Sequence, residues 1–386
     1  MSSNDLRAST QASEQANEVS PPIPQTVQLK EMSTRTETRR AFIDPDGELC
    51  LVVGGKNAVT FVVCPKTLAR ASPFFKTLLY GGFAESKQPG KSSSTEWIVE
   101  LPEDCPHAME ILLNIIHSYF DKIPVSVDPL PSHSPTRAFK CWSLYKLTVI
   151  TDKYDLTRIL QPWAQNWVKG IVARLPLLGP THPVMKTTFA EFLSWIAWEL
   201  GDKRLFRKTA KYLTLHSVTD EEGGLRLDYG RSKRLFSYSL EPAGLSIHVS
   251  NKRMEAIQSM LRPVKDVVTR LSQGCGPSSS SLCKYHQDKD DCEVTMLGAL
   301  IQSLTRKHLC PIPEPEAVSI SIVQLADKLK SIDSKSRLHP HECVALPDIT
   351  SDVDKVLDGA GYPILVSQSQ YLKAQAKKTE VALWYV

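Results

Sequence analysis

The sequence predicts an α+β fold in its N-terminal part and a mostly helical C-terminal part. First, residues 42–175 contain short apolar runs of strand length, separated by turn residues and followed by runs with helical spacing. Second, after residue 183 the apolar residues recur almost entirely at helical intervals. Third, a chain of 386 residues exceeds the size of one ordinary hydrophobic core, which favours at least two domains.

The composition is that of a soluble globular protein, with 42% hydrophobic residues, 23% charged residues and a net charge of +4. So small a charge argues against a dedicated nucleic-acid binder, whose domains usually have a concentrated basic face. The basic pairs Arg39–Arg40 and Lys252–Arg253 are too short to change this, and we expect them to be solvated. Neither a secretory signal nor about 20 consecutive apolar residues are visible, so we expect an intracellular protein, cytoplasmic or nuclear or both, without a membrane partner.

Order is expected to begin near Phe42. Residues 1–40 are rich in Ser, Thr, Gln, Glu and Pro without an apolar period, and this composition is typical of a disordered tail. The turn signal Asp44–Gly47 then leads to apolar runs at 49–53 and 59–63, which flank a tight Gly-Gly-Lys-Asn connection and predict a hairpin. Because both runs are nearly all apolar, we expect a sheet covered on both faces. Residues 97–101 predict a third strand.

Several helices are predicted between these strands and residue 176. Ser72 is a candidate N-cap for a helix with Pro73 at its first position. Asp104 or Cys105 is expected to cap the strongest helix. Its apolar stripe is formed by Met109, Leu112, Leu113, Ile116, Tyr119 and Phe120. Two more helices are predicted, at 141–154 and at 157–175. For the second, Thr157 is a candidate N-cap, although Pro162 would place the regular start a few residues later.

The sequence PLLGPTHP, residues 176–183, interrupts these patterns, and we place the domain boundary there. The expected organisation is a tail at 1–40, an α+β domain at 41–176, a mainly helical region with a short β segment at 177–273, a loop with Ser and Cys at 274–293, and a helical region at 294–386. Predicted helices in the second half are 186–216, 251–272, 294–307, 319–332, 351–358 and 367–378. Pro263 is expected to kink or break the second of these.

Three segments make the α+β region resemble a BTB/POZ domain, most closely those of a large set of fungal proteins. They are the hairpin leading to LARASPFFKTLL, the segment LPEDCPHAMEILLNIIH, and LTVITDKYDL followed by LQPWAQNWV. The resemblance covers about a third of the chain and rests on packing patterns, not on a catalytic motif. It implies a three-stranded sheet flanked by helices.

The resemblance also implies a function, namely non-catalytic protein–protein association. One alternative is a substrate adaptor of a cullin-type ubiquitin ligase, with the cullin contacted by helices near 106–120 and 141–175. Another alternative is a transcriptional regulator, and another BTB domain is a further candidate partner. The polar segment QTVQLKEMSTRTETRR, where dimerising members often have a hydrophobic helix, argues against a helix-exchanged homodimer. Cys64-Pro65-Lys66 stands where the family usually has a histidine, which argues against the charged groove of repressor members.

Aromatic side chains are the candidate binding anchors, because aromatic residues dominate interface energies. For each of them, packing in the core is the alternative explanation. The candidates are Phe74, Phe75, Tyr80, Phe83, Tyr119 and Tyr145.

Two groups of residues of metal-ligating types are candidate zinc sites. The first is Cys275, Cys283, His286 and Cys292, and the second is His339, His341 and Cys343, with Pro340 between the histidines. Paired zinc ligands usually stand two to four residues apart, which the first group satisfies only at Cys283 and His286. We therefore predict no metal and no cofactor, and expect the nine cysteines to be reduced, partly buried thiols. Spacing alone leaves metal binding by the first group open.

No catalytic motif is visible, so we expect no enzyme activity and no catalytic residues. There is no G-x-S-x-G elbow. Gly54-Gly55 and Gly223-Gly224 do not continue to a Lys-Ser/Thr pair or to a third glycine, as a phosphate loop would.

Overall fold

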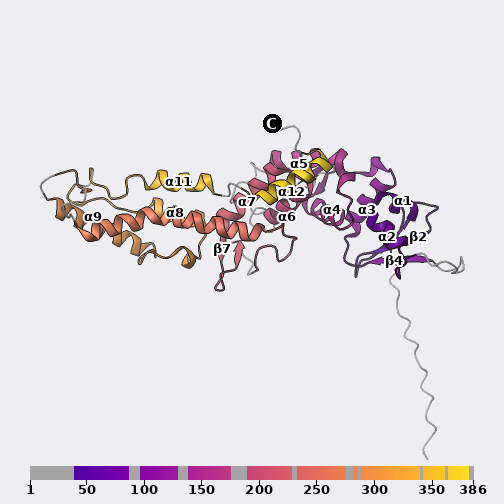
Figure 1. Ribbon diagram of the computed structural model, residues 1–386, viewed down its shortest axis with the longest axis horizontal. Coiled ribbons are helices and arrows are strands. Elements are labelled where there is room, and N and C mark those ends of the chain that lie inside the picture. The colour runs from indigo at the N-terminus through magenta and orange to yellow at the C-terminus, as the bar shows by residue number, and fades with distance from the viewer. Residues whose placement is uncertain are drawn as a thin grey trace, which may run out of the picture. The chain divides into compact units, whose positions relative to one another are not determined.

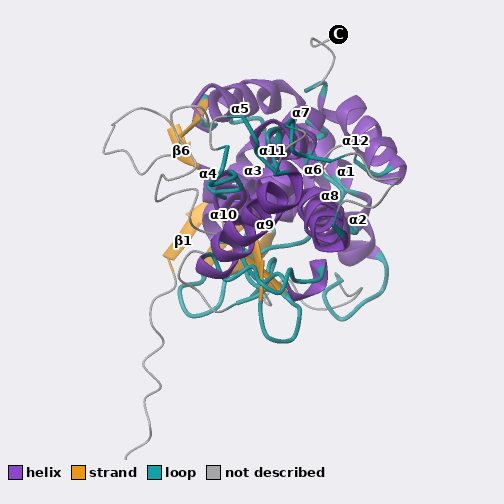
Figure 2. Cartoon of the chain, turned by 90° about the vertical axis from the view of Figure 1, so that its left-hand side faces the viewer, coloured by secondary structure: helices purple, strands orange, loops and turns teal. Residues whose placement is uncertain are grey.

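The described part of the chain is a mixed α+β structure in which helices predominate (Figures 1 and 2). The computed structural model describes residues 39–86, 96–128, 138–174, 189–227, 233–274, 281–285, 288–339, 342–360 and 364–381. The tail predicted to be disordered lies outside these residues, except for its last two positions. None of the described helices combines the length and the apolar character needed to cross a bilayer.

The main sheet has four strands in the order β1-β3-β2-β4. They are β1 (Arg39–Phe42), β2 (Leu49–Val53), β3 (Val59–Val63) and β4 (Trp97–Leu101). The predicted hairpin and third strand are confirmed: β2 and β3 pair antiparallel, and β4 lies parallel to β2. The expectation of three strands is wrong, because Arg39–Phe42 forms a fourth strand, parallel to β3.

One face of this sheet forms part of the main core, and the other is only partly covered. Alternate residues of β2 and β3, such as Leu51 and Phe61, belong to the core. On the opposite face, Phe42, Val62, Cys50 and Ile98 make one cross-strand row. Val62 and Cys50 are buried in the middle of this row, while the side chains at its two ends are exposed. The expected cover on both faces is therefore incomplete.

Three helices lie in the sequence between β3 and residue 116, two of them before β4 and one after it. They are α1 (Pro65–Ala71), α2 (Pro73–Tyr80) and α3 (Pro106–Ile116). Ser72 caps α2 as predicted, since its hydroxyl accepts a hydrogen bond from the backbone N–H of Phe75. Ser118 has a φ of 66°, which continues no right-handed helix, and α3 ends before it. The predicted stripe is therefore too long, because Tyr119 and Phe120 follow α3, and Phe120 belongs to the 3₁₀-helix η1 (Phe120–Lys122).

Next come β5 (Ser126–Asp128), β6 (Ala138–Lys140), α4 (Cys141–Lys153), η2 (Thr157–Leu160) and α5 (Gln161–Arg174). Pro162 stands in the first turn of α5, so the alternative of a later regular start is confirmed. Thr157 caps no helix, because its hydroxyl donates to a carboxylate oxygen of Glu199. That bond ties η2 to the following helix, α6 (Phe189–Leu200).

The hydrophobic core continues past the predicted boundary at residues 176–183. One buried cluster contains residues of β2, β3, α3, α4 and α5 together with α6, α7 (Lys203–His216) and α12 (Val366–Thr379). Tyr145 of α4 stacks on Phe192 of α6, with ring centroids 4.5 Å apart. In α6 the tryptophan Trp198 stacks on Tyr371 of α12 at 4.0 Å. Segments from both ends of the described chain therefore share one core.

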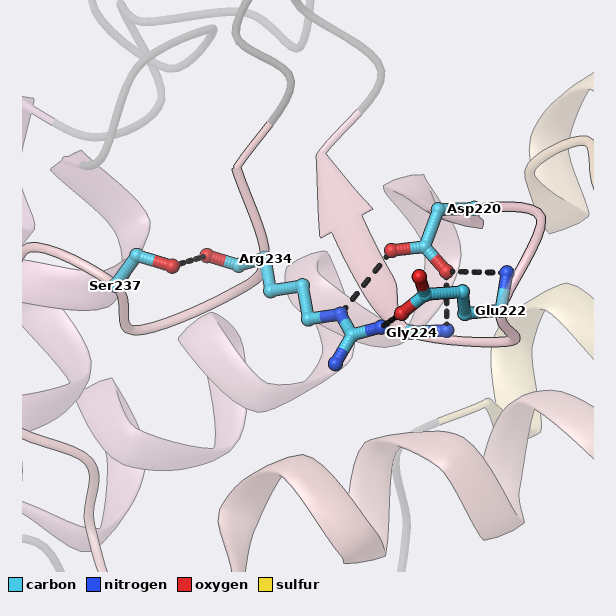
Figure 3. A network of polar contacts seen from close by, with 5 residues as sticks. All are labelled: Asp220, Glu222, Gly224, Arg234 and Ser237. Carbon is cyan, nitrogen blue, oxygen red and sulfur yellow. Dashed lines mark hydrogen bonds and ion pairs between the residues drawn. The ribbon is translucent and has the colours of Figure 1, made fainter.

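A short hairpin follows α7, in the region for which the sequence predicts a short β segment. It consists of β7 (Ser217–Thr219) and β8 (Leu225–Leu227). Figure 3 shows how Asp220 fixes the turn: its carboxylate accepts from the backbone N–H groups of Glu222 and Gly224, at 3.1 and 2.6 Å, and from Arg234. Gly223 has a φ of +78°, which favours glycine there.

A second buried cluster lies among α8 (Leu245–Gln273), α9 (Lys289–Arg306), α10 (Ile322–Lys330) and α11 (Ile349–Gly359). The 3₁₀-helix η4 (Pro315–Ala317) packs against α8. Helices α8 and α9 lie side by side in Figure 1, and α8 continues unbroken through Pro263. The predicted loop at 274–293 is too long, because α9 begins at Lys289.

The prediction that Arg253, which lies in α8, is solvated is wrong. The side chain is buried and donates to three backbone carbonyls, those of Ser217, Val318 and Ile320, at 3.3, 2.7 and 2.6 Å. Burial lowers the pKa of its guanidinium to about 10, so the group is charged at neutral pH. Arg253 therefore joins α8 to β7 and to the segment before α10.

Candidate functional site

The structure divides the six candidate aromatic anchors into two groups. Phe75 and Tyr145 are buried, and Tyr119 is half-buried, so their role as anchors is not supported. The other three are exposed: Phe74 by 43%, Tyr80 by 48% and Phe83 by 54%. All three belong to α2 or to the turn that follows it, so the exposed aromatic candidates concentrate on one segment.

The turn after α2 is held by the hydroxyl of Ser86. This oxygen accepts from the backbone N–H groups of Gly82 and Phe83, at 3.1 and 3.0 Å, and donates to the carbonyl of Leu78 at 2.8 Å. Ser86 is itself buried. The three bonds fix the backbone that carries Phe83, so its exposed ring needs little further ordering when a partner binds.

Strand β4 runs beside this turn. The ring of Trp97 meets that of Tyr80 edge to face, with centroids 6.0 Å apart, and its indole N–H donates to the carbonyl of Glu85 at 2.8 Å. Within the described residues, β4 pairs only with β2 and so forms an edge of the sheet. We call the group formed by Tyr80, Phe83, Trp97 and the outer edge of β4 the α2–β4 surface.

A second candidate site is a cluster of three thiols and an imidazole. Cys283, Cys292, His339 and Cys343 each place a ligand atom within 4.8 Å of the others. The sulfurs of Cys283 and Cys343 are 3.9 Å apart, and Nδ1 of His339 is 3.5 Å from the sulfur of Cys292. All three cysteines are buried and the histidine is half-buried. These four residues are the thiol–imidazole cluster.

Three segments bring the cluster together. Cys292 lies near the start of α9, and Cys283 comes from the described stretch 281–285 before it. The glutamate that follows Cys292, Glu293, accepts from the backbone N–H of Leu282 at 2.7 Å and so holds that stretch against α9. His339 and Cys343 are joined by a hydrogen bond, in which the backbone N–H of Cys343 donates to the carbonyl of His339 at 3.0 Å.

The protonation of Cys292 depends on its surroundings. Burial raises the pKa of its thiol to about 12, and the thiols of Cys283 and Cys343 act in the same direction. A hydrogen bond to the hydroxyl of Ser336, at 3.1 Å, opposes this rise. The group is therefore a neutral thiol at pH 7 unless a cation nearby stabilises the thiolate.

The cluster combines two of the four residues of the first predicted group with two of the three residues of the second. Cys275, His286 and His341 lie outside the described residues. The spacing within each predicted group does not indicate that Cys292 and His339, 47 residues apart, lie together. One available signal was the gap of three residues between His339 and Cys343, which is typical of paired zinc ligands.

Among the described residues, Glu199 is the buried carboxylate whose pKa is shifted most. Burial raises its pKa to about 7. Its oxygens accept from Thr157, from Tyr371 at 3.3 Å and from the side-chain amide of Gln375 at 2.9 Å. A pocket of about 250 Å³ lies between α5 and the start of α7, and Glu199 is not among its lining residues. Through its three hydrogen bonds, Glu199 of α6 contacts both η2 and α12.

The sequence matches no protein-family model, no curated protein and no solved structure.

Proposed function

We propose that this protein is a non-catalytic interaction protein that binds other proteins through its N-terminal sheet and the helices around it, in the manner of a BTB domain. The main support is the α2–β4 surface, where Tyr80 and Phe83 are exposed beside an edge strand. The BTB assignment itself rests on the sequence resemblance. The buried thiols and the buried Glu199 are explained by structural roles, so neither requires a catalytic reaction.

Two properties of the α2–β4 surface favour a protein partner. An edge strand has backbone N–H and C=O groups that an extended segment of another chain can pair with. The aromatic rings beside it supply large contact area at low entropic cost, because a ring has only two side-chain torsions to fix. A partner that adds a strand to β4 would cover Tyr80 and Phe83 with its side chains.

Affinity capture from a lysate, followed by mass spectrometry, tests this proposal when it is done with matched variants. We expect the double substitution Tyr80→Ser and Phe83→Ser to remove partners that the unmodified chain captures. Tyr238→Ser is the control, because Tyr238 is equally exposed at 48% but lies far along the chain from this surface. If the double variant and the unmodified chain retain the same partners, the α2–β4 surface is not the binding site.

A second candidate, the cullin adaptor, is favoured by a different surface. Helix α3 is mostly buried and leaves His107 exposed, so it offers little contact area itself. Just after α3, Phe120 is 57% exposed and lies 5.9 Å from Trp163 of α5, and Val125 nearby in sequence is also exposed. Phe120 and Trp163 fall within the two helical regions from which a cullin contact is predicted, and Val125 lies just beyond the first of them.

The substitution Phe120→Ser separates the two candidates. If the protein is a ligase adaptor, a cullin is captured by the unmodified chain and lost with Phe120→Ser, while Tyr80→Ser with Phe83→Ser leaves it bound. If no cullin is captured, the adaptor function is excluded and binding at the α2–β4 surface remains as a separate outcome.

A further inference from the structure

We propose that Cys283, Cys292, Cys343 and Nδ1 of His339 bind one zinc ion that fastens the described residues 281–285, 336–339 and 342–343 to helix α9. The proposal is independent of the protein-binding function. It rests on the distances between four ligand atoms, on their burial and on their chemistry.

Two of the six distances between these ligand atoms match those of a tetrahedral ion, and all six are within 4.8 Å. With bonds of about 2.3 Å to sulfur and 2.0 Å to nitrogen, a tetrahedral zinc site places two sulfur ligands roughly 3.8 Å apart, and a sulfur and a nitrogen ligand roughly 3.5 Å apart. The sulfurs of Cys283 and Cys343 are 3.9 Å apart, and the sulfur of Cys292 lies 3.5 Å from Nδ1 of His339. A disulfide would need the sulfurs to be about 2.05 Å apart, so the geometry favours four separate ligands over a covalent pair.

The chemistry of the ligands selects the kind of ion. Three thiolates and one imidazole are soft and borderline ligands, which suit zinc and disfavour magnesium or calcium. Four protein ligands also complete the coordination of zinc and leave no position for a water or a substrate. The site is therefore structural. When the ion binds, each cysteine releases its thiol proton to solvent, so three protons leave for each zinc ion.

Outer groups hold the ligands in place. The hydroxyl of Ser336 lies 3.1 Å from the sulfur of Cys292 and can donate to it once this sulfur is a thiolate. The backbone N–H of Tyr285 donates to the sulfur of Cys283 at 3.4 Å. The ring of Tyr285 also lies against that of His339, with centroids 4.4 Å apart, which limits rotation of the imidazole. Such partners are typical of metal sites because they fix the direction of each ligand.

The position of the cluster explains why an ion is needed there. Its cysteines belong to a small apolar cluster that also includes Leu271, Met296 and Ala345, separate from both larger cores. So few buried side chains supply little hydrophobic stabilisation for residues 336–339 and 342–343 and for the stretch at 281–285. A bound ion would fix three segments to one point, as small zinc-stabilised units do.

The first test is the metal content of the full-length chain, purified without chelator and measured by plasma mass spectrometry. We expect about one zinc ion per chain, as a closed four-ligand site requires. Cys343→Ser and His339→Ala should each reduce the zinc content strongly. Cys310→Ser is the matched control, because Cys310 is an exposed free thiol outside the cluster and its loss should leave the zinc content unchanged.

A second test remains informative if a variant fails to fold. Cobalt added to the unfolded, metal-free chain during refolding should give the visible absorption of a tetrahedral thiolate site, and excess zinc should remove it. His339→Cys should restore binding that His339→Ala loses, since a fourth thiolate can replace the imidazole. A folded chain that contains no zinc and gives no cobalt spectrum would overturn the proposal. So would a disulfide between Cys283 and Cys343 in protein kept under reducing conditions.

Discussion

Glu199 and Arg253 show two ways in which a buried ionisable side chain is accommodated. Glu199 accepts from Thr157, Tyr371 and Gln375, yet burial still favours its protonated form and raises its pKa to about 7. Arg253 keeps its charge at neutral pH because burial lowers its pKa only to about 10, and three backbone carbonyls accept from its guanidinium. The first group is therefore sensitive to pH in the physiological range, and the second is sensitive to substitution.

We expect stability to depend on pH through Glu199. The folded state keeps the proton up to about pH 7, whereas an unfolded glutamate releases it near pH 4.3, so the contribution is full below about pH 4 and is lost as the pH rises to about 7. Between pH 4.5 and 8, the free energy of unfolding should fall by on the order of 3 kcal/mol relative to Glu199→Gln. Urea denaturation of both proteins across this range measures the difference. Parallel pH profiles would show that Glu199 has an ordinary pKa.

Substitution of Arg253 should cost much more than substitution of its neighbour. Arg253→Met leaves the carbonyls of Val318 and Ile320 without their donor, and we expect the free energy of unfolding to fall by about 3 kcal/mol. Lys252→Met is the control, because Lys252 pairs with the exposed Glu255 and such surface pairs contribute less than about 1 kcal/mol. Equal effects of the two substitutions in thermal or denaturant unfolding would contradict the structural role of Arg253.

For single residues, the sequence predicts roles that depend on neighbouring residues better than roles that depend on contacts with distant segments. Ser72 was identified as an N-cap because its place before Pro73 and an apolar run is a local pattern. Arg253 was predicted to be solvated, since the three carbonyls that surround it come from segments 36 to 67 residues away. The same limit applied to the thiol–imidazole cluster, whose two halves have no local relation in the sequence.

Among the secondary-structure elements, helix α2 is held in place largely by the side chain of Ser72. The hydroxyl of Ser72 accepts from the backbone N–H of Phe75 and donates to the carbonyl of Tyr154 at 2.7 Å, and the residue is buried. It thereby caps α2 and joins it to the end of α4. Because α2 precedes the turn that presents Phe83, this contact also positions the α2–β4 surface.

We therefore expect Ser72→Ala to lower the free energy of unfolding by about 2 kcal/mol, since it removes a cap and leaves a buried carbonyl without its donor. Ser259→Ala is the control, because Ser259 is an exposed residue in the middle of α8 whose hydroxyl bonds within its own helix. The free energy of unfolding of each variant, obtained from urea titration, decides the point. A loss below about 0.5 kcal/mol for Ser72→Ala, the range of ordinary surface substitutions, would contradict this role.

The elements that the sequence missed have weak local signals. Strand β1 spans four residues, two of them arginines, and it is stabilised by parallel pairing with β3 and by the ion pair of Arg40 with Glu96. The start of α9 has Lys289, Asp290 and Asp291 in place of an apolar period. Two acidic residues in a first turn do favour a helix start, and this signal was available in the sequence.

For the whole molecule, the unexpected feature is a core that includes residues on both sides of the predicted boundary. The Pro-rich segment 176–183 is a valid local signal for a break in secondary structure, but it says nothing about which helices pack together. Tyr145 against Phe192, and Thr157 against Glu199, join α4 and η2 to α6. Residues 41–176 on their own would lose these contacts with α6, so their ability to fold alone needs a direct test.

We expect a chain truncated after residue 176 to lose cooperative unfolding, because α4 and α5 would lose the buried surface that they share with α6 and α12. Differential scanning calorimetry of the truncated and full-length chains tests this, with the full-length chain as the reference. A sharp transition for the truncated chain at the same temperature as one in the full-length chain would show that residues 41–176 are an independent domain.

The site of protein binding is tested most directly by hydrogen exchange of the full-length chain, free and bound to a captured partner. We expect slower exchange of the backbone amides at residues 80–86 and 96–101, because a strand added to β4 would pair with its open edge and cover the turn after α2. The amides of α8 should be unchanged. Protection confined to other regions, with 80–86 and 96–101 exchanging as in the free chain, would contradict binding at the α2–β4 surface.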